Sequence, residues 1–247
     1  MNLPTIGLIV PPASGQVPPD GGELYAGRAS FIARGLGLGE ISPDGFDQIV
    51  EDIVERAVEL RDAGAVAVSM MGTSLSFYRG AAFTEDLRAR MAEATGLPCT
   101  TMSHAIVAAL RALGVRRVAV ATSYIDALNQ ALRRYLESRD FEVVALRGLS
   151  VAGVDAVGRI GGEELTRLAR ATVTDAPHAD GLLISCGGLR TFGLLAPLEA
   201  ELGMPVTASS PAGFWDAMRV AGLDPSADGF GRLFAGRDLQ LSAASVA

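Results

Sequence analysis

The stretch Gly181-Leu182-Leu183-Ile184-Ser185-Cys186-Gly187-Gly188-Leu189 decides the fold of this 247-residue chain. Residues 181–184 form a short apolar run, which is typical of a buried parallel strand. Because the run stops at a turn of small residues, Cys186 is expected at the carboxyl end of the strand, where open α/β sheets bind ligands. Gly187 and Gly188 allow a tight turn whose N–H groups can approach an anion. The thiol is then a candidate proton donor or nucleophile; the alternative is a small buried hydrophobe.

Strands and helices alternate on both sides of this stretch. Apolar runs predict strands over residues 5–10, 65–68, 97–100, 116–122, 141–146, 181–184 and 204–207. Amphipathic spacing predicts helices over residues 42–63, 83–96, 103–113, 126–138, 162–174 and 213–220. Ser42 is the expected N-cap of the first of these helices. Such alternation indicates right-handed βαβ units and parallel sheets.

The pattern of strand ends occurs twice along the chain. Cys186 follows Gly72 by 114 residues, and Pro205 follows Pro98 by 107. We therefore predict an α/β fold with two pseudo-symmetric lobes, each a four-stranded parallel sheet flanked by helices. The first lobe would comprise residues 1–114 and 209–247, and the second residues 115–208. A ligand would bind in the cleft between the carboxyl ends of the two sets of strands, with Gly72 and Cys186 on opposite walls.

Composition excludes several classes of partner. The net charge is −7 without a basic patch, so nucleic acid is not expected as a partner. No apolar run approaches the ~20 residues that span a bilayer, and no signal-peptide pattern is present, so we expect a cytoplasmic protein without membrane contact. The segment 31–39 carries three glycines but no G-x-G-x-x-G pattern and no expected strand before it, so nucleotide binding is not expected there.

The cysteines and histidines do not form a metal or disulfide framework. The two cysteines are too few for a disulfide scaffold, and Cys99 falls within an expected strand and is interpreted as core. The two histidines, His104 and His178, lie far apart in the sequence, so no metal site is expected. Arg190 is the cation nearest to Cys186 in the sequence.

The two walls of the predicted cleft differ in chemistry. Two opposed thiols would support racemisation, whereas the single thiol of Cys186 facing Gly72 delivers a proton to one face of a planar intermediate only. Thr73 and Ser74 follow Gly72 at a strand-to-helix turn, where hydroxyls and N–H groups can form an oxyanion site; the alternative is that they cap the next helix. Tyr124 also follows an expected strand, and its hydroxyl can donate to the same anion unless the ring is a packing residue.

Three motifs resemble the arylmalonate decarboxylase family, a branch of the aspartate/glutamate racemase superfamily. They are Met71-Gly72-Thr73-Ser74-Leu75-Ser76-Phe77-Tyr78-Arg79-Gly80, Ser185-Cys186-Gly187-Gly188-Leu189 and Ser209-Ser210-Pro211-Ala212-Gly213-Phe214-Trp215-Asp216. The resemblance runs from about Thr5 to Phe234. Racemases of this superfamily carry a cysteine on both walls, and Gly72 stands in the place of the first. The resemblance implies a flavodoxin-like fold of the aspartate/glutamate racemase type.

The resemblance further implies decarboxylation of α-aryl or α-alkenyl malonates without metal or cofactor, by a monomer. One carboxylate would be held by Thr73, Ser74, Tyr124 and the amides near Gly187, and Cys186 would protonate the enediolate on one face to give an optically active acid. The second carboxylate would face an apolar wall, and the expected lining residues are Pro12, Leu38, Ile41, Val154 and Val157. Differences at Phe46 and Val157 put the substrate preference in question. Each apolar residue alone is equally compatible with ordinary core.

Two alternatives remain open at the level of sequence. One is another activity of the superfamily, a racemase or a maleate isomerase-like enzyme, although both normally need two cysteines and only Cys186 is suitably placed. The other is a non-catalytic module that holds a carboxylate in the same cleft. Proton exchange in deuterated water would distinguish an enzyme from such a module.

Overall fold

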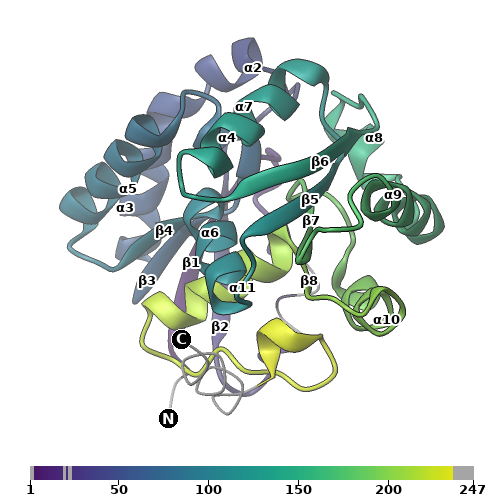
Figure 1. Ribbon diagram of the computed structural model, residues 1–247. Coiled ribbons are helices and arrows are strands. Elements are labelled where there is room, and N and C mark those ends of the chain that lie inside the picture. The colour runs from purple at the N-terminus through teal and green to yellow at the C-terminus, as the bar shows by residue number, and fades with distance from the viewer. Residues whose placement is uncertain (1–2, 19–20, 22–23, 236–247) are drawn as a thin grey trace.

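Two four-stranded sheets form the core of the protein (Figure 1). The structure is a computed structural model, and it describes residues 3–18, 21 and 24–235. The strands of the first sheet are β1 (Thr5–Val10), β2 (Ser30–Gly35), β3 (Ala67–Met70) and β4 (Cys99–Thr101). Those of the second are β5 (Arg117–Thr122), β6 (Glu142–Gly148), β7 (Gly181–Ser185) and β8 (Val206–Ala208).

The two sheets have the same topology. Their orders are β2-β1-β3-β4 and β6-β5-β7-β8, and every pairing is parallel. The central strands are buried because helices cover both faces of each sheet, which explains their continuous apolar sequences. The structure thus confirms the predicted fold class of two pseudo-symmetric α/β lobes, and β3 and β7 hold equivalent places in them.

The helices and short helical turns connect these strands. They are α2 (Pro43–Asp47), η1 (Val50–Asp52), α3 (Ile53–Asp62), α4 (Thr73–Phe77), α5 (Ala81–Thr95), α6 (Met102–Ala112), α7 (Asp126–Glu137), α8 (Val154–Gly158), α9 (Gly162–Thr174), α10 (Phe192–Leu202), α11 (Ser209–Val220) and η2 (Arg232–Phe234). Ser42 caps α2 as expected, since its side chain accepts a hydrogen bond from the Gly45 N–H. The single helix predicted over residues 42–63 is divided, because Ile49 leaves helical geometry at φ −124° and ψ −9°.

Strand β2 is the one strand that the apolar pattern did not predict. In the part of the chain that the structure describes, it pairs only with β1, at the edge of the first sheet, and its residues are partly exposed. The edge position explains the weak signal, because Arg34 and Gly35 interrupt the apolar run that a central strand would show. The glycines of residues 31–39 therefore end a strand and form the loop after it.

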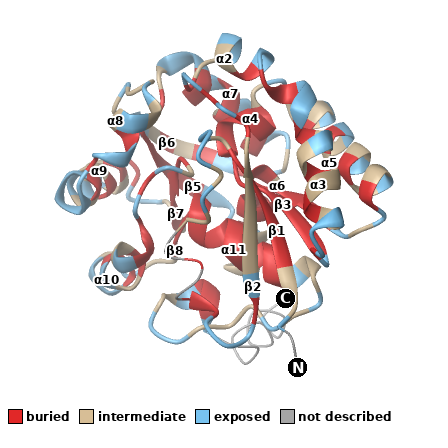
Figure 2. Ribbon diagram, turned by 180° about the vertical axis from the view of Figure 1, so that it is seen from behind, coloured by how far each residue is buried: buried red, intermediate tan, exposed pale blue. Residues whose placement is uncertain are grey.

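Helices α6 and α11 lie between the two sheets (Figures 1 and 2). Helix α11 packs against α6, against β3 and β4 of the first sheet, and against β7 and β8 of the second. The buried carboxylate of Asp216 on α11 accepts a hydrogen bond from Thr100 Oγ1 on β4 at 2.6 Å and pairs with Arg219. Helix α11 therefore contacts both sheets, and these contacts do not assign it to one lobe. The lobe boundaries stay a prediction, and residues 236–247 lie outside the described residues.

Candidate active site

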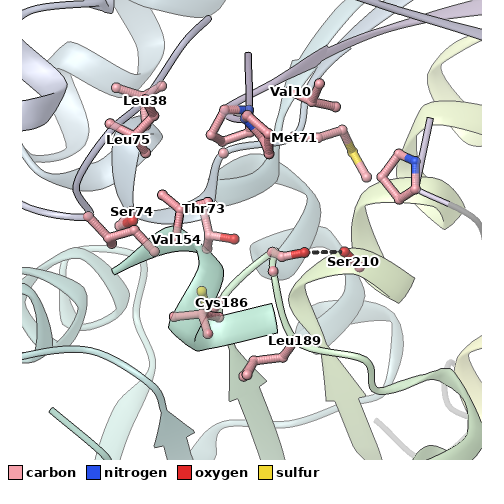
Figure 3. Close-up of a pocket in the computed structure, with 18 of the residues that line it drawn as sticks. Val10, Leu38, Met71, Thr73, Ser74, Leu75, Val154, Cys186, Leu189 and Ser210 are labelled. Carbon is pink, nitrogen blue, oxygen red and sulfur yellow. Dashed lines mark hydrogen bonds between the residues drawn. The ribbon is translucent and has the colours of Figure 1, made fainter. Parts of the chain in front are cut away.

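A cavity of about 290 Å³ lies where the carboxyl ends of β1, β3 and β7 meet (Figure 3). Its walls come from both lobes. The lining residues are Val10, Pro11, Pro12, Ser14, Gln16, Val17, Pro18, Leu38, Ile41, Phe46, Met71, Gly72, Thr73, Ser74, Leu75, Val154, Val157, Cys186, Gly187, Gly188, Leu189, Arg190 and Ser210. The sheets therefore bring their ligand-binding edges to one shared site, as expected for open α/β sheets.

Cys186 is the first residue after β7 and is almost fully buried, with 5% exposure. Its N–H donates to Ser209 Oγ at 3.2 Å, and its carbonyl accepts from the Leu189 N–H at 3.2 Å, which closes the turn. Burial raises the pKa of the Cys186 thiol, while the Ser123 hydroxyl, the Gly188 N–H and the Tyr124 hydroxyl lower it to a smaller extent. The thiol is therefore protonated at neutral pH, as a proton donor must be.

Gly187 brings the cysteine loop against the opposite wall. A Cβ at this position would lie 3.0 Å from the carbonyl oxygen of Met71 and 3.6 Å from Thr73 Oγ1. The Gly187 carbonyl accepts a hydrogen bond from Ser210 Oγ at 3.0 Å, which Figure 3 shows as a dashed line. A side chain at position 187 would therefore need the opposite wall to shift by a few tenths of an ångström, so glycine suits this close approach.

Thr73 and Ser74 begin the short helix α4, directly after Gly72 (Figure 3). Neither side chain caps a helix: the N-cap of α4 is Gly72 without a side-chain cap bond, and the N-cap of α5 is Gly80. Thr73 Oγ1 is buried and has no hydrogen-bond partner among the described residues. The capping interpretation therefore fails, and an unpartnered hydroxyl lines the cavity, where a ligand oxygen could accept from it.

A buried polar contact holds Thr73 in place. Ser76 Oγ donates to the Thr73 carbonyl at 2.7 Å and accepts from the Ser103 N–H at 3.1 Å. The N-terminus of α6 therefore fixes the backbone of α4, so the first turn of α4 is oriented before any ligand binds. Such preorganisation is what an oxyanion site needs.

Tyr124 lies behind the cavity wall. It is fully buried, does not line the cavity, and packs its ring on Phe77 at 6.0 Å between centroids. Its hydroxyl accepts from Ser185 Oγ at 3.5 Å. Burial, and then the nearby Cys186 thiol, raise the pKa of Tyr124, whereas the hydroxyls of Ser185, Thr73 and Ser74 lower it. The structure thus brings the Tyr124 hydroxyl beside Cys186 and Thr73 but gives it no open face.

The five apolar residues expected as the second wall all line the cavity. Leu38 and Ile41 come from the first lobe, and Val154 and Val157 of α8 come from the second. The two segments are joined by an antiparallel bridge between Glu40 and Gly153, which includes a hydrogen bond from the Ile41 N–H to the Ala152 carbonyl at 2.9 Å. Pro12 completes the wall.

Several lining residues are not among the expected site residues. Leu75 and Ser210 fall inside the quoted motifs, and the segment 14–18 follows the first predicted strand, so position alone could have indicated them. Three serines contact Cys186 or support its loop, namely Ser123, Ser185 and Ser209. Each of them ends a strand or follows one directly, so their sequence positions could also have indicated the site.

The described part of the chain contains no cluster of three or more histidine, cysteine or acidic side chains that could hold a metal ion. No helix among the described residues has the length and apolar character needed to cross a membrane. Cys99 is buried within β4, as expected of a core residue.

The two lobes with a single cysteine in the shared cleft define an α/β protein of the aspartate/glutamate racemase type. The sequence model of the family described as arylmalonate decarboxylase matches residues 6–234. Arylmalonate decarboxylase of Bordetella bronchiseptica is 53% identical, with 94% of this chain and 97% of that protein covered. The chain therefore belongs to the arylmalonate decarboxylase family, a family of carboxy-lyases, and the resemblance seen in the motifs is confirmed.

Solved structures agree with this assignment. A liganded arylmalonate decarboxylase variant, with a glycine-to-cysteine and a cysteine-to-serine replacement, superposes with a TM-score of 0.92 at 52% identity, covering 94% of this chain and 98% of that one. Maleate cis-trans isomerase of Nocardia farcinica bound to TRIS superposes with a TM-score of 0.88 at 26% identity, covering 98% and 100%. The decarboxylase variant thus carries replacements at one glycine and one cysteine.

Proposed function

We propose that this protein decarboxylates α-aryl or α-alkenyl malonates to optically active carboxylic acids, without a cofactor. The proposal rests on the two residues Cys186 and Gly72. Cys186 places a protonated thiol on one side of the cavity, and Gly72 places no acid on the other side. Family membership and 53% identity to an arylmalonate decarboxylase support it.

The reaction begins with one substrate carboxylate in a polar site. Thr73 Oγ1, which has no hydrogen-bond partner in the described part of the chain, and the Ser74 hydroxyl are its side-chain donors, with the Gly187 backbone opposite them. Tyr124 supports this site from behind, through its hydroxyl beside Ser185, Thr73 and Ser74. Fixed donors of this kind stabilise the charge that grows on the carboxylate as the reaction proceeds.

The second carboxylate faces the apolar wall. Leu38, Ile41, Val154 and Val157, together with Pro12, offer it no hydrogen-bonding side chain. Its C–C bond breaks, it leaves as neutral CO₂, and the bonding electron pair moves onto the retained carboxylate as an enediolate. Poor solvation of the departing carboxylate favours this step.

Cys186 then completes the reaction. The thiol transfers its proton to Cα of the enediolate, and the resulting thiolate regains a proton from water, so that one proton is consumed for each CO₂ released. Because Gly72 cannot donate from the other face, the product is a single enantiomer.

The proposal includes a monomeric cytoplasmic enzyme whose partner is a small dicarboxylate and not nucleic acid or membrane. The acidic balance of the chain and its composition support this. Light scattering during size-exclusion chromatography tests the monomer. Activity retained after dialysis against a chelator tests the absence of a metal requirement.

The direct test is to incubate the protein with phenylmalonate and follow CO₂ release together with proton uptake, and then to analyse the phenylacetate formed in D₂O for one incorporated deuterium. An α-methyl-α-phenylmalonate substrate reports enantioselectivity. Absence of turnover with every α-aryl and α-alkenyl malonate would exclude the proposed function. A parallel assay with maleate tests the isomerase alternative, which a maleate isomerase relative at 29% identity favours but the single cleft cysteine does not.

A further inference from the structure

Arg190 is the one charged side chain among the described residues that line the cavity. It follows the cysteine turn directly and lies in the loop between β7 and α10. Within the described ranges, no aspartate, glutamate, lysine or histidine lines the same space. The polar site deeper in the cavity therefore consists of neutral donors, and any attraction from a full positive charge must come from Arg190.

The residues at the rim of the cavity are exposed to solvent, and those at its floor are buried. Thr73, Ser74 and Cys186 are buried, whereas Ser14, Gln16 and Arg190 are exposed. The pKa of Cys186 is set by burial and by hydrogen bonds from its immediate neighbours, with no contribution from the guanidinium. Arg190 thus stands at the mouth, away from the proton donor.

The fold itself does not explain this arginine. Within residues 3–18, 21 and 24–235, Arg190 takes part in no side-chain hydrogen bond or ion pair, unlike Arg147 and Arg170, which form bidentate pairs with carboxylates. It also precedes Thr191, the N-cap residue of the eleven-residue helix α10. The positive end of a helix dipole favours anions, so a cation at this place gains nothing from the helix.

We propose that Arg190 determines substrate specificity by attracting the dianion of a malonate to the mouth of the cavity and favouring it over the monoanionic product. This inference rests on the proposed function. A net charge of −7 repels a dianion, and a local positive charge at the mouth offsets that repulsion along the approach path. Because Coulomb energy scales with the charge of the ligand, loss of one carboxylate halves the attraction and assists product release.

The test compares Arg190→Leu with Arg167→Leu, a matched control that removes an exposed arginine on α9, away from the cavity. At low ionic strength, we expect Arg190→Leu to lower kcat/KM for phenylmalonate about fivefold to tenfold, through KM, with kcat at saturation unchanged. The difference in kcat/KM between the wild type and Arg190→Leu should shrink at about 0.5 M salt, because salt screens the charge of Arg190 in the wild type. Arg190→Lys should retain most of kcat/KM, and Arg190→Glu should lower it further.

Three results would overturn the inference. The first is an unchanged kcat/KM at low salt in both Arg190→Leu and Arg190→Glu. The second is a loss of kcat/KM in Arg167→Leu equal to that in Arg190→Leu, and the third is a fall in kcat of Arg190→Leu with KM unchanged. Titration calorimetry separates this inference from the proposed function. If the wild type binds phenylmalonate but never turns it over, the decarboxylase proposal fails. Arg190→Leu must then still weaken binding of phenylmalonate more than that of phenylacetate. Equal weakening of both ligands, or no binding of either, would contradict the role of Arg190.

Discussion

Gly72 and Cys186 lie at equivalent ends of the two sheets and line one cavity from opposite lobes. Gly72 comes two residues after β3, and Cys186 comes one residue after β7, the matching strand. An internal duplication thus places two related turns around one ligand site. A thiol occupies one turn and a hydrogen atom the other, and this difference governs the stereochemistry of the proposed reaction.

Replacement of Cys186 by alanine should abolish product formation while the fold remains intact. Loss of a positioned proton donor typically costs 10²–10⁴-fold in rate. Cys186→Ser should retain only a small part of the activity, because a hydroxyl is a much weaker acid. CO₂ release gives the rate, and far-UV circular dichroism checks the fold. Near wild-type turnover of the alanine variant would show that another group protonates the intermediate.

Introduction of a second thiol at Gly72 should confer racemisation. A Cβ at this position would lie 3.2 Å from Pro11 Cγ and 3.3 Å from Leu75 Cβ, so a cysteine needs only small shifts of its neighbours. With acids on both faces, Gly72→Cys should exchange the α-proton of a chiral α-aryl propionate and invert its configuration. Chiral chromatography in D₂O measures both effects. Gly72→Ala is the matched control, and a Gly72→Cys variant that never exchanges the α-proton would refute the opposed-walls arrangement.

Removal of the Thr73 hydroxyl should reduce the stabilisation of the enediolate. Thr73 Oγ1 is buried without a hydrogen-bond partner of normal geometry among the described residues, so the alanine variant chiefly loses a donor to the ligand. We expect kcat to fall about 10²–10³-fold in Thr73→Ala, and Thr73→Ser to keep most of the rate. Steady-state kinetics with phenylmalonate measure the change. If Thr73→Ala and Thr73→Ser lose the same activity, the loss comes from the changed shape of the side chain and not from the missing hydroxyl.

The activity should persist into alkaline solution. Burial holds the pKa of Cys186 above its ordinary value of about 8.5, so the thiol stays protonated where a free thiol ionises. We expect kcat to stay constant through pH 8.5 and to fall only at higher pH, as the pH–rate profile will show. A decline centred below pH 8 would contradict the protonated resting state.

Raised thiol pKa values also predict how the stability of the protein depends on pH. The thiols of Cys99 and Cys186 both have raised pKa values in the folded protein, chiefly because of burial. Their contribution to the free energy of unfolding is complete below the unfolded value of about 8.5, and is lost as the pH rises toward the folded values. Denaturant titrations from pH 7 to 10 should therefore show falling stability above pH 8.5. The Cys99→Ala variant should show a weaker dependence.

Loss of the Thr100 hydroxyl should destabilise the protein. The buried Asp216 carboxylate on α11 would keep Arg219 but lose the 2.6 Å hydrogen bond from Thr100 Oγ1. We expect Thr100→Val to lower the free energy of unfolding by about 1–3 kcal/mol, with Thr100→Ser close to wild type. Urea denaturation measures the difference. An unchanged midpoint would mean that water replaces the hydroxyl.

The sequence by itself determined the alternation of strands and helices, the duplication, and the residues that end the strands. Buried parallel strands require apolar runs and helices require amphipathic spacing, so both are visible in the order of residues. The strand-end positions of Gly72 and Cys186 followed from the same reasoning, and the quoted motifs indicated the family. The edge strand β2 escaped prediction, because a strand paired on one side does not need a fully apolar sequence.

Only the tertiary structure decided how these parts meet. It placed Tyr124 behind the wall, left Thr73 Oγ1 without a hydrogen-bond partner in the described ranges, and set Arg190 at the mouth of the cavity. It also joined the two lobes over the apolar wall through the Glu40–Gly153 bridge. The Thr100–Asp216 hydrogen bond and the Glu40–Gly153 bridge each join residues more than 100 positions apart. Local sequence patterns carry no information on such contacts, and the packing of the two lobes alone establishes them.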